Sequence, residues 1–423
     1  MPKQLLVVNL YTNSILESVV ELKKRPQFAD LEILVLTRTP EKYESVGHPE
    51  VVIRILPCDF DDEATMRQTL EPFANDIAGV ICRGDKHIQY LRKILPVLPD
   101  DLCVPSVAAL QASTDKKLMR QAFAAKFPEI TPAHIQVSDA QPETVDAIEA
   151  SISYPVIVKP TSLVSSMLIQ SCHTRQELEV ALDKVFTTIG DIYEREERLG
   201  VPEVIVEEFM EGDFYSIDAF ALENGDCYYS PPVAYLPAKS MGIDDFFLYK
   251  RWIPTELSDE EIAAANDACR KALMAVELAY SVAHVELVHT KNGWKIIELG
   301  PRLGRFRQTM YAASYGIDHS MNDILVRLGQ KPEIVSELIA SCAAYSIYPE
   351  REGHLQEITG LDTVEKLPTI DYFKLLSVPG QVCKFAKHGG GALLEVIIKS
   401  NDEKEFAESV DFIESSVKAV VVD

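Results

Sequence analysis

The sequence predicts a multidomain protein that begins with a parallel α/β unit and continues with mixed α+β parts. Its first hundred residues alternate helical patterns with short apolar runs at 5–10, 31–37, 51–57 and 77–83, which is typical of parallel α/β units. Residues 203–236 hold apolar runs separated by turn residues, as in antiparallel strands. The 423 residues are enough for about three domains.

Composition and charge narrow the class of protein. With 47% apolar residues and no apolar run near the roughly 18 residues that span a bilayer, we expect a globular protein rather than a disordered or membrane-spanning one. The net charge of −24 disfavours nucleic acid and anionic membranes as partners. The N-terminal apolar run is too short for a signal peptide, and the 8 Cys show no metal spacing. We therefore expect a cytoplasmic protein.

Further elements are predicted along the chain. A helix is expected over 113–127, with Ser113 or Thr114 as its cap. A second helix is expected over 258–278, where Ser258 and Glu261 form a capping box. The remaining expected elements are strands at 154–160, 341–349, 381–387 and 392–400, and helices at 173–186 and from about residue 401.

The stretch HVELVHTKNGWKIIELGPR, residues 284–302, carries the most functional information. A three-residue turn ending at Gly293 would place Glu286 opposite Glu298 on one sheet face. Because opposed like charges destabilise a sheet, such a pair indicates a divalent cation, and oxygen ligands alone suit Mg²⁺ or Mn²⁺. A two-residue Asn-Gly turn would instead send the glutamates to opposite faces, and the hairpin alone leaves both alternatives open.

Two lysines are candidates for phosphate binding. Lys159 follows a strand that is apolar on both faces, and Lys116 lies in the first turn of a helix, where the dipole disfavours a cation. A solvated surface lysine is the alternative for each. Glu207 and Glu208 end another apolar strand, and a free backbone edge there could meet an adenine.

Taken in order, six segments resemble the ATP-grasp superfamily: STDKKLMRQAF, YPVIVKP, VIVEEFMEG, RWIPTELSDEE, HVELV and IIELGPRLG. They look most like carboxylate–amine ligases, including bacterial L-amino-acid ligases, with biotin carboxylases and D-alanine–D-alanine ligases more distant. The resemblance implies an ATP-grasp fold with an N-terminal Rossmann-like (pre-ATP-grasp) domain at 1–107. A small lysine-bearing subdomain would follow at 108–205, and a large subdomain at 206–423 would hold the metal carboxylates and, from about residue 335, an α+β portion.

The resemblance also implies roles for individual residues. Glu286 and Glu298 would hold two metal ions, Mg²⁺ or Mn²⁺. Arg302 and Lys159 would be catalytic, because they would stabilise the transferring phosphoryl group. His284, Arg302, Arg305 and Phe306 would contact substrate. The residues implied in ATP binding are Lys116, Lys159, Ser166, Glu207, Glu208, Phe209, Met210, Asp213 and Ile297.

The implied activity is ATP-dependent formation of an amide or peptide bond through an acyl phosphate. The substrates would be a small carboxylate and an amine, one of them an amino acid, and the resemblance further implies a homodimer. Because acyl phosphates hydrolyse readily, loop 161–168 is expected to act as a lid that excludes water. The alternatives are a thiol or hydroxyl acceptor, or a nucleotide-binding regulatory subunit without turnover.

Three departures from the family pattern support the regulatory alternative. Gly300 stands where many members have a metal-binding Asn, so the number of metal ions is open. Phe214 replaces an acid that holds the ribose, a role that Asp213 could take. The loop after Lys159 lacks the usual glycines, and the hydroxyl of Ser165 or Ser166 could replace their backbone donors.

Overall fold

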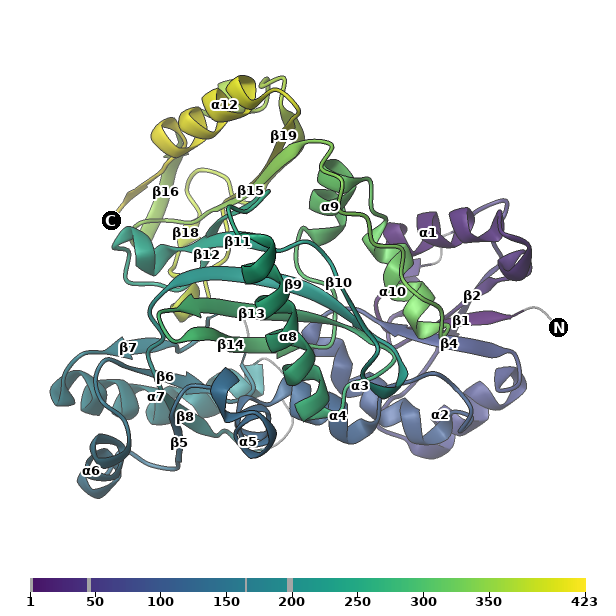
Figure 1. Ribbon diagram of the computed structural model, residues 1–423, viewed down its shortest axis with the longest axis horizontal. Coiled ribbons are helices and arrows are strands. Elements are labelled where there is room, and N and C mark those ends of the chain that lie inside the picture. Colours follow the sequence, from purple (N-terminus) through teal and green to yellow (C-terminus); the bar gives the residue numbers. More distant parts are fainter. Residues whose placement is uncertain (1–2, 44–46, 164–165, 196–200) are drawn as a thin grey trace.

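The computed structural model describes residues 3–43, 47–163, 166–195 and 201–423. Figure 1 shows a large central sheet with the N-terminal sheet on one side, a smaller sheet below it and the C-terminal elements above it. Within the described ranges, no helix combines the length and the apolar character needed to cross a bilayer.

The N-terminal part is the parallel α/β unit that the sequence predicts. Its sheet has the order β3-β2-β1-β4, and every neighbouring pair is parallel. The core around β1 also contains Met321, Ile324 and Leu325 of α10, so a helix from far along the chain packs on this sheet. The elements are β1 (Gln4–Val8), α1 (Asn13–Lys23), β2 (Glu32–Thr37), β3 (Ile53–Pro57), α2 (Glu63–Leu70), β4 (Ile77–Cys82), η4 (Asp85–His87) and α3 (Ile88–Ile94).

Two helices, α4 (Val107–Thr114) and α5 (Lys116–Lys126), connect this part to the next. The expected cap was wrong, because Ser113 and Thr114 form the last turn of α4. The carboxylate of Asp115 caps α5 by accepting the Leu118 N–H at 3.1 Å. A charged cap thus sits one residue before Lys116, which fixes the first turn of α5.

A small antiparallel sheet of order β5-β8-β6-β7 follows. The strand that ends at Glu207 and Glu208 belongs to this sheet, where β8 pairs with β5 and β6. It therefore does not continue into the strands after residue 212, with which the sequence pattern grouped it. The elements are β5 (His134–Val137), α6 (Pro142–Ser151), β6 (Val156–Pro160), β7 (Gln170–Cys172), α7 (Arg175–Arg195) and β8 (Val204–Glu208).

The central sheet has the order β14-β13-β9-β11-β12-β15-β19-β17, with β10 paired to β9. Helix α8, which begins at the predicted Ser258–Glu261 capping box, lies across β9, β13 and β14 (Figure 1). The elements are β9 (Asp213–Ala221), β10 (Cys227–Tyr229), β11 (Val233–Pro237), β12 (Leu248–Ile253), α8 (Asp259–Val276), β13 (Ser281–Thr290), β14 (Gly293–Gly300), α9 (Arg307–Tyr315), α10 (His319–Arg327), β15 (Ser341–Ile347), β17 (Ile370–Leu375) and β19 (Leu394–Ser400).

The β13–β14 hairpin differs from both expected turns. Thr290 pairs with Gly293, so the turn has two residues, but they are Lys291 and Asn292. With this turn alone, the glutamates would face opposite sides of the sheet. A β-bulge between Glu286 and Leu287 on the ladder shifts the register, and Glu286 pairs with Glu298. The expected pairing is confirmed, although the expected turn is wrong.

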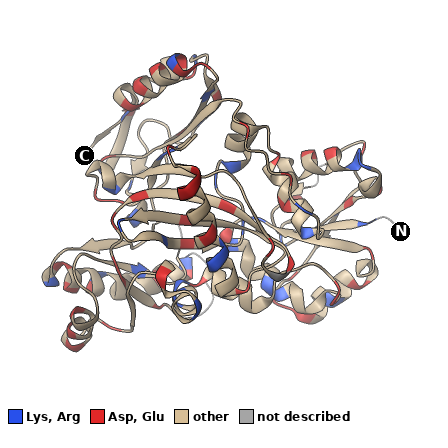
Figure 2. Ribbon diagram, in the orientation of Figure 1, with Lys and Arg blue, Asp and Glu red and all other residues tan. Residues whose placement is uncertain are grey.

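The C-terminal elements complete the upper part of the molecule. A three-stranded sheet, β18-β16-β20, packs with β15 and β19 around a shared core. Acidic side chains mark α12 and other outer helices, as the net charge requires (Figure 2). The remaining elements are β16 (Gly353–Ile358), α11 (Leu361–Val364), β18 (Val382–Cys383), α12 (Glu403–Ser416) and β20 (Ala419–Val422).

Candidate functional site

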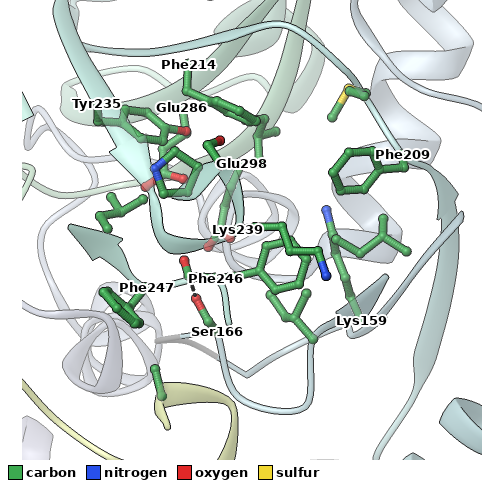
Figure 3. Close-up of a pocket in the computed structure, with 18 of the residues that line it drawn as sticks. Lys159, Ser166, Phe209, Phe214, Tyr235, Lys239, Phe246, Phe247, Glu286 and Glu298 are labelled. Atoms are coloured by element: carbon green, nitrogen blue, oxygen red, sulfur yellow. Dashed lines mark hydrogen bonds between the residues drawn. The ribbon is translucent and has the colours of Figure 1, made fainter. Parts of the chain in front are cut away.

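A pocket of about 550 Å³ lies where the N-terminal part, the small sheet and the central sheet meet. Figure 3 shows Glu286 and Glu298 on one side of it, with Lys159 and Phe209 on the other. Of the residues that the sequence predicts for the site, those that line the pocket are Lys116, Lys159, Ser166, Glu208, Phe209, Met210, His284, Glu286, Ile297, Glu298, Arg302 and Arg305.

A buried network orients the metal-binding candidate Glu286. Asp218, on the neighbouring strand β9, is fully buried and lies 2.6 Å from Nδ1 of His284. Nε2 of the same ring lies 3.5 Å from Oε1 of Glu286. Gly304 donates its N–H to Asp218 at 3.0 Å, and a Cβ there would lie only 2.5 Å from the His284 ring. Only glycine permits this approach. His319 completes the network at 2.9 Å from Asp218.

The network also sets the charge states at this end of the pocket. Burial alone would raise the pKa of Glu286, but its contact with His284 and the charges of Arg302 and Arg251 hold that pKa below its usual range. Burial would lower the pKa of His284, but the Asp218 carboxylate raises it. Glu286 is therefore kept ionised, as a carboxylate ligand of a cation must be. Both nitrogens of His284 face carboxylates, so the ring positions Glu286 rather than contacting substrate.

The two lysines come from different elements and meet carboxylates at the pocket wall. Nζ of Lys116 lies 3.3 Å from Oε2 of Glu298 and donates to the Leu163 carbonyl at 3.1 Å. Nζ of Lys159 donates to Oε2 of Glu207 at 2.9 Å. Both lysines are almost completely buried. The alternative of solvated surface lysines is therefore wrong for both.

Arg120 of α5 links this lysine end to the metal end. Its Nε and Nη2 donate to the Glu207 carboxylate at 2.7 and 3.1 Å. Its Nη1 and Nη2 also donate to the carbonyls of Ile296 and Ile297 at 3.1 and 2.7 Å. Those carbonyls belong to the β14 segment in which the ladder shifts register. Burial would raise the pKa of Glu207, but Arg120 and Lys159 hold it far below its usual range.

The chain after β8 offers a backbone edge at the pocket. The N–H groups of Glu208 and Phe209 are already bonded to the carbonyls of Ala133 and Pro155, at 2.9 and 3.0 Å. Within the described part of the chain, the Met210 N–H has no hydrogen-bond acceptor. A planar ligand with a ring acceptor, such as adenine, fits this donor, with Phe209 and Phe214 among the apolar walls.

The expected lid is described except for residues 164–165, so Ser165 lies outside the described residues. Ser166 has a positive φ of 60° and donates its hydroxyl to the Phe246 carbonyl at 3.2 Å (Figure 3). In the same segment, the buried Asp245 accepts the Ala386 N–H at 2.6 Å. Leu168 of the loop also donates its N–H to the Lys387 carbonyl at 3.2 Å, so the loop is bonded to both the central and the C-terminal parts.

Arg302 lines the pocket and contacts the N-terminal part of the chain. Its Nε donates to Asp85 at 2.7 Å, and burial would lower its pKa while the Asp85 carboxylate raises it. Asp85 belongs to the segment GVICRGDK, which does not match a phosphate loop because Asp85 stands where that motif has a lysine. Arg305 also lines the pocket and forms an ion pair with Glu395.

Three of the predicted site residues lie outside the pocket. Glu207 is fully buried behind Lys159, so its carboxylate positions that lysine instead of contacting ATP. Asp213 is exposed at the start of β9 and does not line the pocket, so its contact with a ribose stays a prediction that the pocket lining does not support. Phe306 is covered by the guanidinium groups of Arg251 and Arg305, at 5.4 and 5.1 Å from its ring centroid.

Sequence reasoning missed Asp85, Arg120 and Asp218. Arg120 follows Lys116 by four residues in one helix, which places both on the same face, and that spacing was an available signal. Asp218 alternates with Ser216 on β9, but a single strand does not reveal its two histidine partners. Asp85 is brought to Arg302 only by the packing of the N-terminal part, and no local pattern indicates this contact.

The donor set fits a magnesium–nucleotide ligand. Glu286 and Glu298 present carboxylate oxygens to one pocket from directly opposed positions. Among the described residues, no group of three or more His, Cys, Asp or Glu side chains forms a closed metal site. Mg²⁺ typically takes one or two protein carboxylates and completes its shell with waters and phosphate oxygens. The two glutamates fit that requirement, while the nearby lysines match phosphate.

Comparisons with known proteins identify the fold of this chain. Residues 152–310 match the model of the ATP-grasp domain. An uncharacterised protein, y4rH of Sinorhizobium fredii, is 24% identical over 382 residues, which cover 89% of this chain and 74% of that protein. A D-alanine–D-alanine ligase of Bacillus velezensis is 27% identical over 252 residues, or 55% of this chain and 65% of the ligase.

The solved structures show the same fold. An L-amino acid ligase from Bacillus licheniformis matches with a TM-score of 0.76 and 19% identity, covering 100% of this chain and 99% of that chain. A phosphoribosylglycinamide synthetase from Anaerococcus prevotii matches with a TM-score of 0.63 and 19% identity, covering 99% and 100%. The predicted fold class is therefore confirmed, with a parallel N-terminal sheet before the ATP-grasp elements.

Proposed function

Since the chain contains an ATP-grasp domain within an ATP-grasp fold, we propose that it is an ATP-dependent ligase that joins a carboxylate to an amine. One observation carries the proposal. Glu286 and Glu298 are opposed across a hairpin in the pocket that Lys116 and Lys159 also line. This combination of paired carboxylates and buried lysines supports binding of a magnesium nucleotide with its phosphates between them.

The proposed reaction has two steps. A carboxylate oxygen of the acid attacks the γ-phosphorus of ATP, the bond to the β–γ bridging oxygen breaks, and ADP leaves. The amine nitrogen then attacks the carbonyl carbon of the acyl phosphate, phosphate leaves, and the nitrogen loses a proton to the released phosphate or to solvent. The product is an amide or peptide.

The residues of this chain have separate tasks in that reaction. Lys159 and Arg302 place positive charge beside the phosphoryl group, where negative charge is spread in the transition state. Mg²⁺ or Mn²⁺, held by Glu286 and Glu298, supplies further charge stabilisation. The loop around Ser166, bonded across the pocket mouth to Phe246, excludes water from the acyl phosphate.

The proposal is tested by measuring ADP and phosphate release with pools of amino acids and other small carboxylates, offered with and without amines. We expect release that requires an acid and is lost in Glu298→Gln. The matched control is Glu260→Gln, an exposed glutamate in the first turn of α8, which should behave like the parent. ATP binding without ADP release in every pool would instead favour the regulatory alternative. Identification of the product as an amide, thioester or ester decides among the acceptors.

A further inference from the structure

Two buried arginines at the far end of the pocket have only neutral hydrogen-bond partners. Arg251 on β12 is 7% exposed, and Arg307 at the start of α9 is 1% exposed. Nη1 of Arg251 lies 3.3 Å from both the Leu248 carbonyl and the Ser346 hydroxyl. Nη2 of Arg307 donates to the Ser216 hydroxyl at 2.6 Å. Neither guanidinium forms an ion pair with a carboxylate of the described residues.

Other buried arginines of this chain show the usual arrangement. Arg120 is paired with Glu207, and Arg327 is paired with Asp323 at 3.2 Å. A buried guanidinium without a counter-charge is costly, because it has lost its hydration and gained no opposite charge. Arg251 and Arg307 differ from the other two because neither forms an ion pair with a carboxylate of the described residues, although both line the pocket.

The surroundings add to the excess of positive charge. Arg305 lies across the Phe306 ring from Arg251, and both guanidiniums are within 5.4 Å of the ring centroid. Burial, together with repulsion from Arg307 and Arg305, lowers the pKa of Arg251 to about 9. Among the described residues, Nε of Arg307 is buried without a hydrogen-bond partner. The side chains of Arg251 and Arg307 both line the cavity.

We propose that Arg251 and Arg307 bind a second, non-reacting anionic group of the acid that this site activates, so that its substrate is a dianion. A dicarboxylate or a phosphonate-bearing carboxylate has this chemistry, and the guanidinium fork suits both groups. An acid with an ammonium at that end would be repelled by the arginines. The inference rests on the proposed ligase function, because it names the class of acid that is phosphorylated.

The sheet order places the arginines away from the metal end. The strands of Glu286 and Arg251, β13 and β12, are separated in the sheet by β9 and β11, which amounts to roughly 14 Å at three strand spacings. Both side chains line the same pocket, so the reacting carboxylate would lie at the metal end and the second anionic group at the arginines.

The test uses acids that differ only in the charge at their far end. Succinate is compared with succinamate, glutarate with glutaramate, and L-glutamate with L-glutamine. Hydroxylamine replaces the amine substrate, because it attacks the acyl phosphate and yields a hydroxamate and phosphate, so only the acid is selected. For at least one pair we expect kcat/KM for the dianion to exceed that for its amide about 30-fold or more.

Variants assign that preference to the arginines. Arg251→Gln should bring the dianion-to-amide ratio close to one, because the charge that distinguishes the two acids is gone. Arg251→Lys keeps the charge and should keep most of the preference, which separates a charge effect from a packing defect. Lys250→Gln is the matched control, since Lys250 lies next to Arg251 on β12 but pairs with Glu414 outside the pocket. It should retain the parental ratio. In the same assay, 3-phosphonopropionate against succinate distinguishes a phosphonate from a carboxylate as the second group.

The outcomes separate this inference from the ligase proposal. Hydroxamate formation with equal rates for both members of every pair, or a ratio that survives Arg251→Gln, overturns the inference and leaves the ligase function standing. A preference for L-glutamate over L-glutamine that is seen only when these two amino acids are offered as the amine, with another acid, overturns the assignment to the acid. Failure to form ADP with any acid overturns the ligase proposal, and the inference with it.

Discussion

Arg120→Met removes the side chain that joins the lysine end of the site to the metal end. Methionine keeps an unbranched chain in the same space but takes away every donor. The substitution deletes two bonds to Glu207, at 2.7 and 3.1 Å, and two to the carbonyls of Ile296 and Ile297, at 3.1 and 2.7 Å. Glu207 and Ile296 are buried and Ile297 is half-buried, so these groups are not freely rehydrated.

The expected loss follows from these contacts. Breaking a buried ion pair by removing one partner costs about 3–5 kcal/mol, and the lower value applies because Lys159 still contacts Glu207. Leaving two carbonyls without their donors adds about 1 kcal/mol each at the low end. We therefore expect the free energy of unfolding to fall by about 5 kcal/mol, a large share of the roughly 5–15 kcal/mol typical of a folded protein.

Urea unfolding followed by tryptophan fluorescence measures this loss, since Trp294 is buried on β14 next to the contacted carbonyls. The control is Arg175→Met. Arg175 pairs with Asp146, Glu149 and Glu179 at the surface, and loss of exposed pairs should cost about 1 kcal/mol or less. A second readout is the Mn²⁺ concentration that half-saturates ADP release, which should rise only in Arg120→Met. Equal stability losses in the two variants, with an unchanged Mn²⁺ requirement, would refute the reasoning.

Three further predictions concern the same site. Glu286→Gln removes one of the two carboxylates that are opposed across the hairpin, so ADP release should fall about 100-fold or more, as after loss of a charge-stabilising group. Asp85→Asn removes the charged partner of Arg302, and steady-state kinetics should show kcat lowered about tenfold with little change in KM for ATP. The free energy of unfolding of Glu207→Gln should depend less on pH than that of the parent protein. The folded protein holds the pKa of Glu207 below its usual 4.5, so the parent loses this stabilisation as the pH falls below that value, whereas the variant has none to lose. Unfolding free energies at about pH 7 and about pH 4 check the difference.

Local signals in the sequence were sufficient for much of the fold. Apolar runs gave the four parallel strands of the N-terminal sheet, and the Ser258–Glu261 capping box gave the start of α8. The cap of α5 was misplaced because Ser113, Thr114 and Asp115 are all good capping residues in a row. In the structure α4 continues through Thr114, so Asp115 is the residue that caps α5.

In the candidate site, too, some residues were predicted from the sequence and others were not. Lys116, Lys159, Glu286 and Glu298 were predicted because each stands in a short motif, and the structure brings all four to one pocket. Asp213 was expected to replace a missing ribose ligand, but strand β9 presents Phe214 to the pocket instead. Alternation along a strand allows only one of two neighbours to face a given side.

What the sequence determined by itself is the set of elements and the chemistry of the site, because periodicity, caps and short motifs depend on neighbouring residues. What only the tertiary structure decided is which distant groups meet. The bulge that pairs Glu286 with Glu298 lies on β14, and Arg120 of the distant helix α5 donates hydrogen bonds to its carbonyls. Arg251 of β12 and Arg307 of α9 line the same pocket, although α8, β13 and β14 separate them along the chain. Contacts across such long stretches of chain depend on packing, and no local pattern records them.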